Sequence, residues 1–271
     1  ILINTYQTDL SVCTLIAVIP YSPSTKLDLY LVDPPGRPLV ACLHGGGFVS
    51  GGRDDERCGQ AAALLNEAGF NCASISYSLA SPEDRFGVWP RNLFDVADAV
   101  TWLHQQAERY GYSCEPFGML GFSAGCCLAN LYIQGGKRIF KHLGYDTEVF
   151  FPSALVGFYG PYDFPSRQVG RKSSDNDLNR DHSPSFWVRR RNSPAPPVLH
   201  IQGDRDTIVY PDQHQRFQRD YEELGYSFTA IEARGFGHSF APRDLNDAGE
   251  SLDLPPRIVA FFTRHLVDGG N

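Results

Sequence analysis

Two kinds of hydrophobic pattern alternate along this chain of 271 residues. Short, continuous apolar runs recur between segments whose apolar residues repeat every three or four positions. Continuous runs of this length are typical of strands buried on both faces of a parallel sheet. The runs that predict such strands are 39–43, 70–77, 117–121, 154–159, 198–202 and 228–232.

The segments between these runs predict helices. The clearest is 90–110, in which the apolar residues from Leu93 to Ala107 form one stripe. Pro90 suits a first helical turn, and Gly111 suits the left-handed position after the last turn. Further helices are predicted at 56–68, 212–224 and 256–267. Strands that alternate with helices indicate an α/β fold, with a mostly parallel central sheet and helices on both faces.

Three segments depart from this alternation. The runs 12–19 and 27–32, separated by prolines, predict an antiparallel pair of strands ahead of the parallel ones. The stretch 163–197 has few apolar residues and is too long for an ordinary connection. We interpret it as a short lid-like excursion over the carboxyl edge of the sheet. It is too short for a second domain, so residues 1–271 are expected to form a single domain.

Charge and composition narrow the range of partners and cofactors. The net charge is −7, whereas nucleic acid and anionic membranes need a basic face, so neither is expected as a partner. No apolar run approaches the ~20 residues that cross a bilayer. The chain contains no C-x-x-C or H-E-x-x-H motif, so no metal or other cofactor is expected. Homo-oligomer formation is left open.

The cysteines indicate the compartment. Their number, seven, is odd, and several fall inside predicted core elements, among them Cys42, Cys72, Cys126 and Cys127. Buried free thiols behave as small apolar residues and fit a reducing environment better than a disulfide framework. A cytoplasmic location is therefore the expectation.

A possible nucleophile lies at the end of one predicted strand. Residues 121–125 read Gly-Phe-Ser-Ala-Gly, a G-x-S-x-G pattern between the strand 117–121 and a good helix start. Two glycines allow a strand to turn sharply into a helix and leave the hydroxyl of Ser123 exposed at the tip. A serine that merely caps a helix in a glycine-rich turn would show the same five residues. The residues that follow favour the nucleophile.

A serine hydroxyl needs a base to remove its proton. Of the eight histidines, His238 follows the last predicted strand, and a loop at the carboxyl edge of the sheet can carry its imidazole over the serine. An orienting acid should follow another strand, and the loop Gly203-Asp204-Arg205-Asp206 offers two aspartates. Asp206 is favoured because it lies deeper in the loop, whereas Asp204 could tie the loop to its own backbone.

Donors for an oxyanion are predicted in the segment His44-Gly45-Gly46-Gly47, after the first core strand. Glycines allow backbone amides to approach a substrate closely. The expected donors are the amides of Gly46 and Gly47, with that of Ala124 after the serine. His44 is expected to brace this loop. A phosphate-binding loop is disfavoured because no G-x-x-x-x-G-K-[ST] motif is present.

These motifs and their order resemble the α/β-hydrolase superfamily, and in particular the esterases with an HGGG oxyanion motif. The segments that carry the resemblance are HGGGF at 44–48, GFSAG at 121–125, the GDRD loop at 203–206 and GH at 237–238. Within these esterases the chain is similar to the hormone-sensitive-lipase-like and acetylxylan/feruloyl-esterase-like branches. Phe122 replaces the aspartate that is usual in the first branch and brings the elbow nearer to the second.

The resemblance implies a serine carboxylesterase that cleaves a small-molecule ester through an acyl-enzyme. Two alternatives remain: an amide-cleaving relative of arylformamidase-like or peptidase-like type, and a non-catalytic binding protein on the same scaffold. Aromatic residues near the oxyanion loop and the neighbouring strand ends are expected to line the acyl pocket. They are Phe48, Phe122 and Tyr159, with Phe158 and Tyr162 as further candidates. Such crowding predicts a preference for acetyl to butyryl groups.

Overall fold

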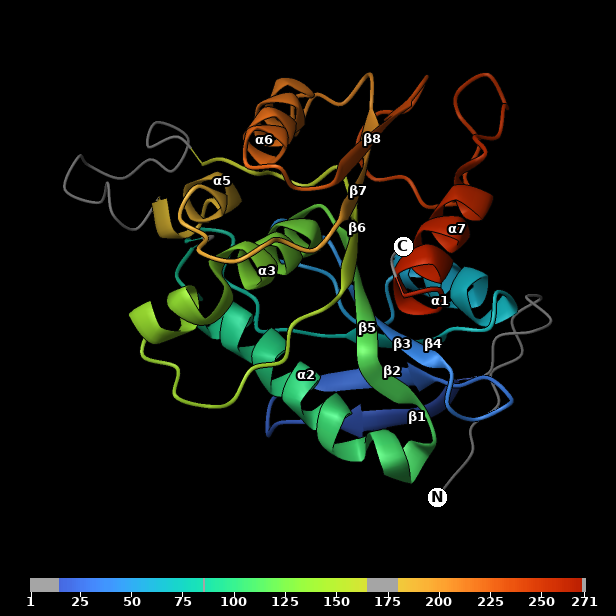
Figure 1. The fold of residues 1–271 in the computed structure, drawn as a ribbon. Coiled ribbons are helices and arrows are strands. Elements are labelled where there is room, and N and C mark those ends of the chain that lie inside the picture. The colour runs from blue at the N-terminus through green and yellow to red at the C-terminus, as the bar shows by residue number, and fades with distance from the viewer. Residues whose placement is uncertain (1–14, 85, 165–179, 270–271) are drawn as a thin grey trace.

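The computed structural model describes residues 15–84, 86–164 and 180–269. Eight strands form one sheet in the order β1-β2-β4-β3-β5-β6-β7-β8 (Figure 1). The strands are β1 Leu15–Pro20, β2 Lys26–Tyr30, β3 Pro38–Leu43, β4 Asn71–Ile75, β5 Ser113–Phe122, β6 Ala154–Phe158, β7 Val198–Gly203 and β8 Phe228–Ala233. β2 runs antiparallel to both of its neighbours, β1 and β4, and the other pairs are parallel. The mostly parallel sheet and the initial antiparallel pair are therefore confirmed.

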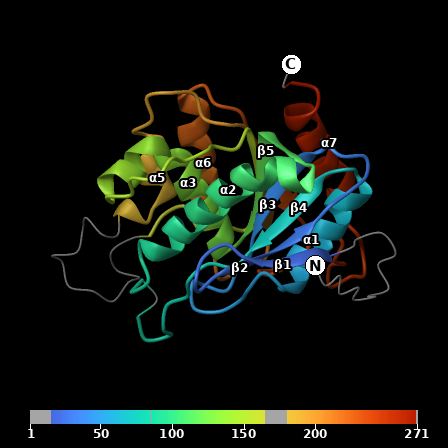
Figure 2. The ribbon, with the colours of Figure 1, turned by 90° about the horizontal axis from the view of Figure 1, so that it is seen from below.

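Helices cover both faces of the sheet, as the alternating pattern predicts (Figures 1 and 2). The helices are α1 Glu56–Glu67, α2 Arg91–Tyr110, α3 Ala124–His142, α5 Pro184–Val188, α6 Asp212–Glu223 and α7 Leu254–Leu266. One hydrophobic cluster joins the sheet to α2, α3, α5 and α6, and a second joins the opposite face to α1 and α7. This architecture is the α/β-hydrolase fold.

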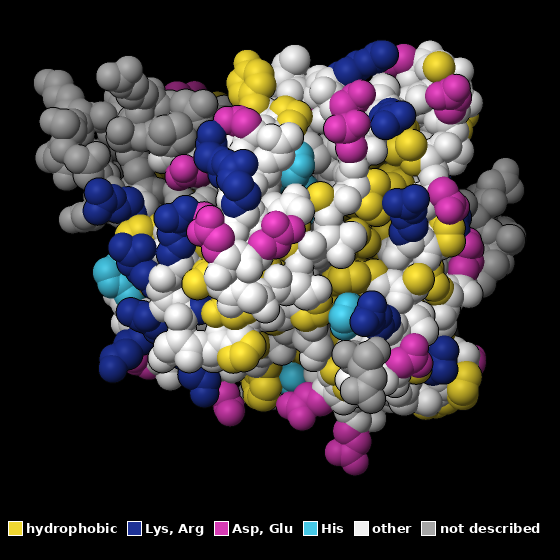
Figure 3. Space-filling model, turned by 45° about the horizontal axis from the view of Figure 1, so that its top comes forward, with side chains coloured by type: hydrophobic (Ala, Val, Ile, Leu, Met, Phe, Trp, Pro, Cys, Tyr) yellow, Lys and Arg dark blue, Asp and Glu magenta, His cyan; other side chains and the backbone are white. Residues whose placement is uncertain are grey.

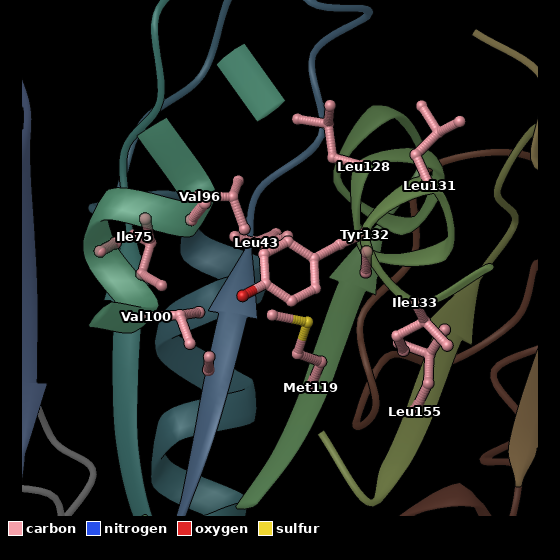
Figure 4. Close-up of a cluster of buried hydrophobic side chains, with 14 of the residues drawn as sticks. Leu43, Ile75, Val96, Val100, Met119, Leu128, Leu131, Tyr132, Ile133 and Leu155 are labelled. Atoms are coloured by element: carbon pink, nitrogen blue, oxygen red, sulfur yellow. The ribbon is translucent and has the colours of Figure 1, made fainter. Parts of the chain in front are cut away.

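The first cluster shows how the two patterns fit together. Val96 and Val100 on α2 and Tyr132 on α3 point toward side chains of the central strands (Figure 4). Met119 of β5 and Leu155 of β6 point to this face and have no exposed surface. The packing fixes β5 at the centre of the molecule, so the turn after β5 has a rigid base on both sides.

Several predicted segments have other bounds in the structure. The last helix begins at Leu254 and not at 256, because Pro255 and Pro256 fit a first helical turn that needs no proline N–H. In the predicted excursion 163–197, residues 165–179 lie outside the described residues, so the expected lid is not described. The part that follows contains α5, a helix of five residues that is too short for a periodic pattern to reveal.

The structure adds one observation on membranes. In the three described ranges, no helix is long and apolar enough to cross a bilayer.

Candidate active site

Ser123 lies on a strained turn between β5 and α3. Its backbone has φ 49° and ψ −115°, and its N–H donates to the carbonyl of Phe158 at 2.9 Å. The flanking glycines are required by contact: a Cβ on Gly121 would lie 2.7 Å from the carbonyl of Gly125, and a Cβ on Gly125 would overlap the carbonyl oxygens of Leu43 and His44. The strain therefore persists because the surrounding backbone leaves no other path.

The structure brings together the three residues that the sequence singles out. Ser123 Oγ lies 2.9 Å from His238 Nε2, and His238 Nδ1 lies 2.7 Å from Asp206 Oδ2. An ionised carboxylate can only accept, so the proton of the neutral ring is on Nδ1 and the lone pair of Nε2 faces the serine hydroxyl. In this tautomer the imidazole can remove the hydroxyl proton.

Asp206 is held as a carboxylate by four donors. Oδ1 accepts from the amides of Ile208 and Val209 at 2.8 and 2.9 Å, and Oδ2 accepts from His238 and from Gln202 Nε2 at 2.8 Å. Burial acts to raise the pKa of Asp206, but the hydrogen bonds from His238, Val209 and Ile208 outweigh burial and hold the pKa below its ordinary value. The carboxyl is therefore charged at neutral pH.

Asp204, the other aspartate of the loop, has a different partner. It is exposed, and its Oδ1 accepts from the amide of Gly235 at 2.8 Å. It therefore ties its loop to the turn that leads to His238, and not to its own backbone as the sequence suggested.

The glycine loop after β3 lies against the serine. A Cβ on Gly45 would lie 3.3 Å from Ser123 Cβ, and Gly46 has φ +107°, a conformation that side chains disfavour. Ala124 is the first residue of α3, so its N–H lies at the positive end of the helix. In the described part of the chain, the N–H groups of Gly46, Gly47 and Ala124 have no protein acceptor.

His44 braces this loop, as expected. It is fully buried, its Nδ1 donates to the carbonyl of Gly45 at 2.7 Å, and its ring stacks on Tyr77 at 4.1 Å. The Tyr77 hydroxyl donates in turn to the His44 carbonyl at 2.8 Å. Burial lowers the pKa of His44, so the ring is neutral.

The predicted aromatic lining is partly wrong. Phe122 has no exposed surface and packs on Phe158 at 4.8 Å, in the cluster beneath α1 and α7. It cannot contact a substrate there. Phe158 has no exposed surface either, so it cannot contact a substrate. Tyr162 is also fully buried, with its hydroxyl 2.7 Å from His200 Nδ1.

Tyr159 supports the histidine and is no lining residue. It has no exposed surface, its hydroxyl donates to the carbonyl of Phe240 at 2.7 Å, and its ring lies edge-on to His238 with 4.7 Å between the centroids. Phe48 is the predicted lining residue that keeps some exposure, 6%.

Sequence reasoning missed the partners of Phe48. Its ring centroid lies 6.1 Å from that of Phe86 and 6.4 Å from that of Phe164, and these two rings meet edge-on at 5.4 Å. His182 packs on Phe86 at 4.9 Å. We call these four residues the aromatic wall. They come from three loops without a shared motif, so no sequence signal connects them.

Gln202 was also missed. Its position at the end of β7, four residues before Asp206, is the one signal that could have revealed it. As for metals, no group of three or more His, Cys, Asp or Glu among residues 15–84, 86–164 and 180–269 could hold an ion.

The fold and this arrangement define an α/β-hydrolase. The family model BD-FAE matches residues 27–221, and the chain belongs to this family.

Two curated relatives and one solved structure agree with this assignment. Esterase LipC of Mycobacterium tuberculosis is 29% identical over 266 residues, with 89% of this chain and 62% of the relative covered. Ethyl acetate hydrolase of Pseudomonas putida is 37% identical over 248 residues, with 83% and 72% covered. A carbohydrate esterase from gut microbiota superposes with a TM-score of 0.75 at 20% identity, with 95% and 98% covered. The chain spans less than two thirds of the length of LipC.

Proposed function

We propose that this chain is a serine carboxylesterase that hydrolyses short-chain acyl esters, from acetyl to butyryl, through an acyl-enzyme intermediate. The observation that carries the proposal is the unbroken line of hydrogen bonds from Ser123 Oγ through His238 to Asp206. Amides that have no acceptor among the described residues lie beside it, on the glycine loop and at the start of α3.

The reaction follows from these atoms. His238 Nε2 takes the hydroxyl proton as Ser123 Oγ attacks the ester carbonyl, and Asp206 stabilises the imidazolium without taking the proton. The amides of Gly46, Gly47 and Ala124 donate to the oxyanion, a stabilisation worth a few kcal/mol for each donor. His238 then gives the proton to the leaving alcohol. A water molecule, activated by the same ring, releases the acid and restores Ser123.

The relatives support an ester and a small acyl group. One of them is named for hydrolysis of ethyl acetate, and the chain covers 72% of its length. The aromatic wall adjoins the glycine loop, because Phe48 follows Gly47 in the chain and the rings of Phe86 and Phe164 lie next to that of Phe48. Bulky rings at that position favour a short acyl chain.

We also propose a setting for this activity. All six described cysteines are buried, and none of them forms a disulfide, which supports a reducing compartment and hence the cytoplasm. The partner is proposed to be a small-molecule ester, without nucleic acid or membrane. We propose one catalytic domain, in which 163–197 forms a cap beside the site.

The nucleophile provides the first test. Ser123→Ala should abolish hydrolysis of p-nitrophenyl acetate and labelling by a fluorophosphonate probe while the melting temperature stays near that of the wild type. Ser113→Ala, at the opposite end of β5, is the matched control and should retain both. Labelling of another serine, or activity in Ser123→Ala, would contradict the proposal. Faster cleavage of the matching anilide than of the ester would instead support an amidase.

A further inference from the structure

A line of buried polar side chains continues beyond the carboxylate of Asp206. Gln202 Nε2 donates to Asp206 Oδ2 at 2.8 Å, Gln202 Oε1 lies 3.2 Å from His200 Nε2, and His200 Nδ1 lies 2.7 Å from the hydroxyl of Tyr162. Gln202 is 1% exposed, and His200 and Tyr162 have no exposed surface. The mechanism above uses none of these three residues.

The carboxylate of Asp206, at the inner end of this line, fixes the direction of every hydrogen bond in it. The NH₂ group of Gln202 faces two groups that only accept, the carboxylate of Asp206 and the carbonyl of Val209 at 3.1 Å. Its Oε1 therefore faces His200 and must accept from it. His200 Nε2 must then carry the proton, and the bare Nδ1 must accept from the Tyr162 hydroxyl.

The environment of His200 agrees with this assignment. Burial and the nearby His214 lower the pKa of His200 to about 3, so the ring is neutral and has one acceptor nitrogen to offer Tyr162. Both ring nitrogens are bonded, which a neutral imidazole achieves with one donated and one accepted hydrogen bond.

We propose that Gln202 is a positioning residue for the carboxylate of Asp206, and that Tyr162 and His200 hold its amide in the donating orientation. The proposal rests on the proposed function, since it assigns Asp206 as the orienting acid. Oδ2 is the oxygen that accepts from both Gln202 and His238, so the amide sets where the carboxylate meets the imidazole.

Loss of the Gln202 donor would change how the carboxylate of Asp206 is held. Without Gln202 Nε2, Oδ2 keeps only the hydrogen bond from His238, and the carboxylate can rotate about the two amide bonds to Oδ1. The imidazole then follows the carboxylate, and the contact between Nε2 and Ser123 Oγ loosens. Misplacement of this kind lowers kcat, by about 10- to 100-fold for a shift near 1 Å. It leaves substrate binding unchanged.

The kinetic test compares two buried glutamines. Gln202→Met should lower kcat for p-nitrophenyl acetate by about 10-fold or more and leave KM within about twofold. Gln134→Met is the matched control, because Gln134 is also 1% exposed and donates from Nε2, to Tyr221 at 3.0 Å, away from the triad. It should retain the wild-type kcat. A wild-type kcat in Gln202→Met, or an equal loss in both variants, would overturn the proposal.

A second measurement needs neither variant. Long-range ¹H–¹⁵N NMR of the wild type should show the His200 proton on Nε2, and a proton on Nδ1 would overturn the direction of the line. Tyr162→Phe leaves Nδ1 of His200 without its donor, so it should loosen the line and lower kcat several-fold, while the proton stays on Nε2 because Gln202 Oε1 still accepts it. A wild-type kcat in Tyr162→Phe would contradict the role of Tyr162. If the wild type had no esterase activity, the proposed function would fail while the NMR result would still report on the line itself.

Discussion

Asp204 and Asp206 lie two residues apart in one loop, yet their surroundings differ in almost every respect. Asp206 is 3% exposed and its carboxylate accepts four hydrogen bonds, whereas Asp204 is exposed and accepts one. A buried carboxylate with this many donors stays charged and keeps one orientation. The division of roles follows from position after the strand and not from residue type.

This difference can be measured. Asp206→Asn should lower kcat roughly 10⁴-fold, because the amide favours the wrong imidazole tautomer. Asp204→Asn weakens one exposed hydrogen bond to Gly235, so it should lower the free energy of unfolding by no more than about 1 kcal/mol and keep kcat. Steady-state kinetics and urea unfolding of both variants check the pair. The assignment is wrong if the two variants exchange these behaviours.

His200 predicts how stability depends on pH. Its pKa is about 3 in the folded protein, and an exposed histidine in the unfolded chain titrates near 6.5. The unfolded state therefore binds more protons below 6.5. The stabilisation is complete above that pH and is lost as the pH falls toward 3, with a slope approaching about 1.4 kcal/mol per pH unit. Urea unfolding between pH 7 and pH 4.5 should show a shallower slope for His200→Gln than for the wild type, and equal slopes would refute the prediction.

The sequence located Ser123, Asp206 and His238 because each follows a predicted strand, and the carboxyl ends of parallel strands share one edge of the sheet. It misplaced Phe122 because adjacency in the chain was taken as adjacency in space. Side chains two apart on a strand share a face, and Leu120 and Phe122 both enter the cluster beneath α1 and α7. The strand period would have excluded Phe122 from the pocket.

At the scale of elements, the site depends on how closely α3 approaches β3. Gly125, in the first turn of α3, lies so near the carbonyl oxygens of Leu43 and His44 that a Cβ would overlap them. The same approach sets the start of the glycine loop against the serine turn. Two elements that are distant in sequence thereby bring the proposed nucleophile and the proposed oxyanion donors together.

Two helical glycines test this contact. Gly125→Ala should push α3 away from β3, lower the melting temperature and abolish most of the activity, because the contact is with backbone. Gly59→Ala, in α1, meets no atom of the described residues within 4 Å and should be neutral or stabilise the protein by up to about 1 kcal/mol through helix propensity. Thermal unfolding and kinetics compare them. Wild-type activity and melting in Gly125→Ala would disprove the tight contact.

The line from Gln202 to Tyr162 also depends on how two strands are placed. His200 and Gln202 are two apart on β7, so they share a face, and Tyr162 lies beyond the end of the neighbouring strand β6. The sequence predicted both strands. It could not predict the line, because hydrogen bonds between side chains depend on register and rotamer, which no periodicity encodes.

Over the whole molecule, the charged side chains are distributed unevenly. The net charge is −7, yet exposed basic residues gather around the end of α3 and the segment after α5. They are Lys137, Arg138, Lys141, Arg189 and Arg190. Figure 3 shows Lys and Arg side chains more numerous on the left of the face that it presents. The expectation that neither nucleic acid nor an anionic membrane is a partner was based on the net charge alone, and it stays a prediction.

The convergence of three loops on Phe48 predicts selectivity for acyl length. Phe48 follows the glycine loop, Phe86 lies before α2, and Phe164 lies at the start of the 163–197 segment, with ring centroids 5.4 to 6.4 Å apart. Rings next to the proposed oxyanion donors are expected to limit the depth of the acyl pocket. The wild type should therefore hydrolyse p-nitrophenyl butyrate faster than the dodecanoate when both are kept below their aggregation limits.

Removing one ring of the wall should shift this preference. Phe48→Ala opens space beside the glycine loop, so its ratio of kcat/KM for octanoate over acetate should rise several-fold above that of the wild type. Phe186→Ala is the control, because Phe186 is half-buried on α5, where it stacks under Arg190 at 3.6 Å and not on Phe48. Its ratio should match the wild type. An unchanged ratio in Phe48→Ala, or dodecanoate as the best substrate of the wild type, would show that the wall does not set acyl length.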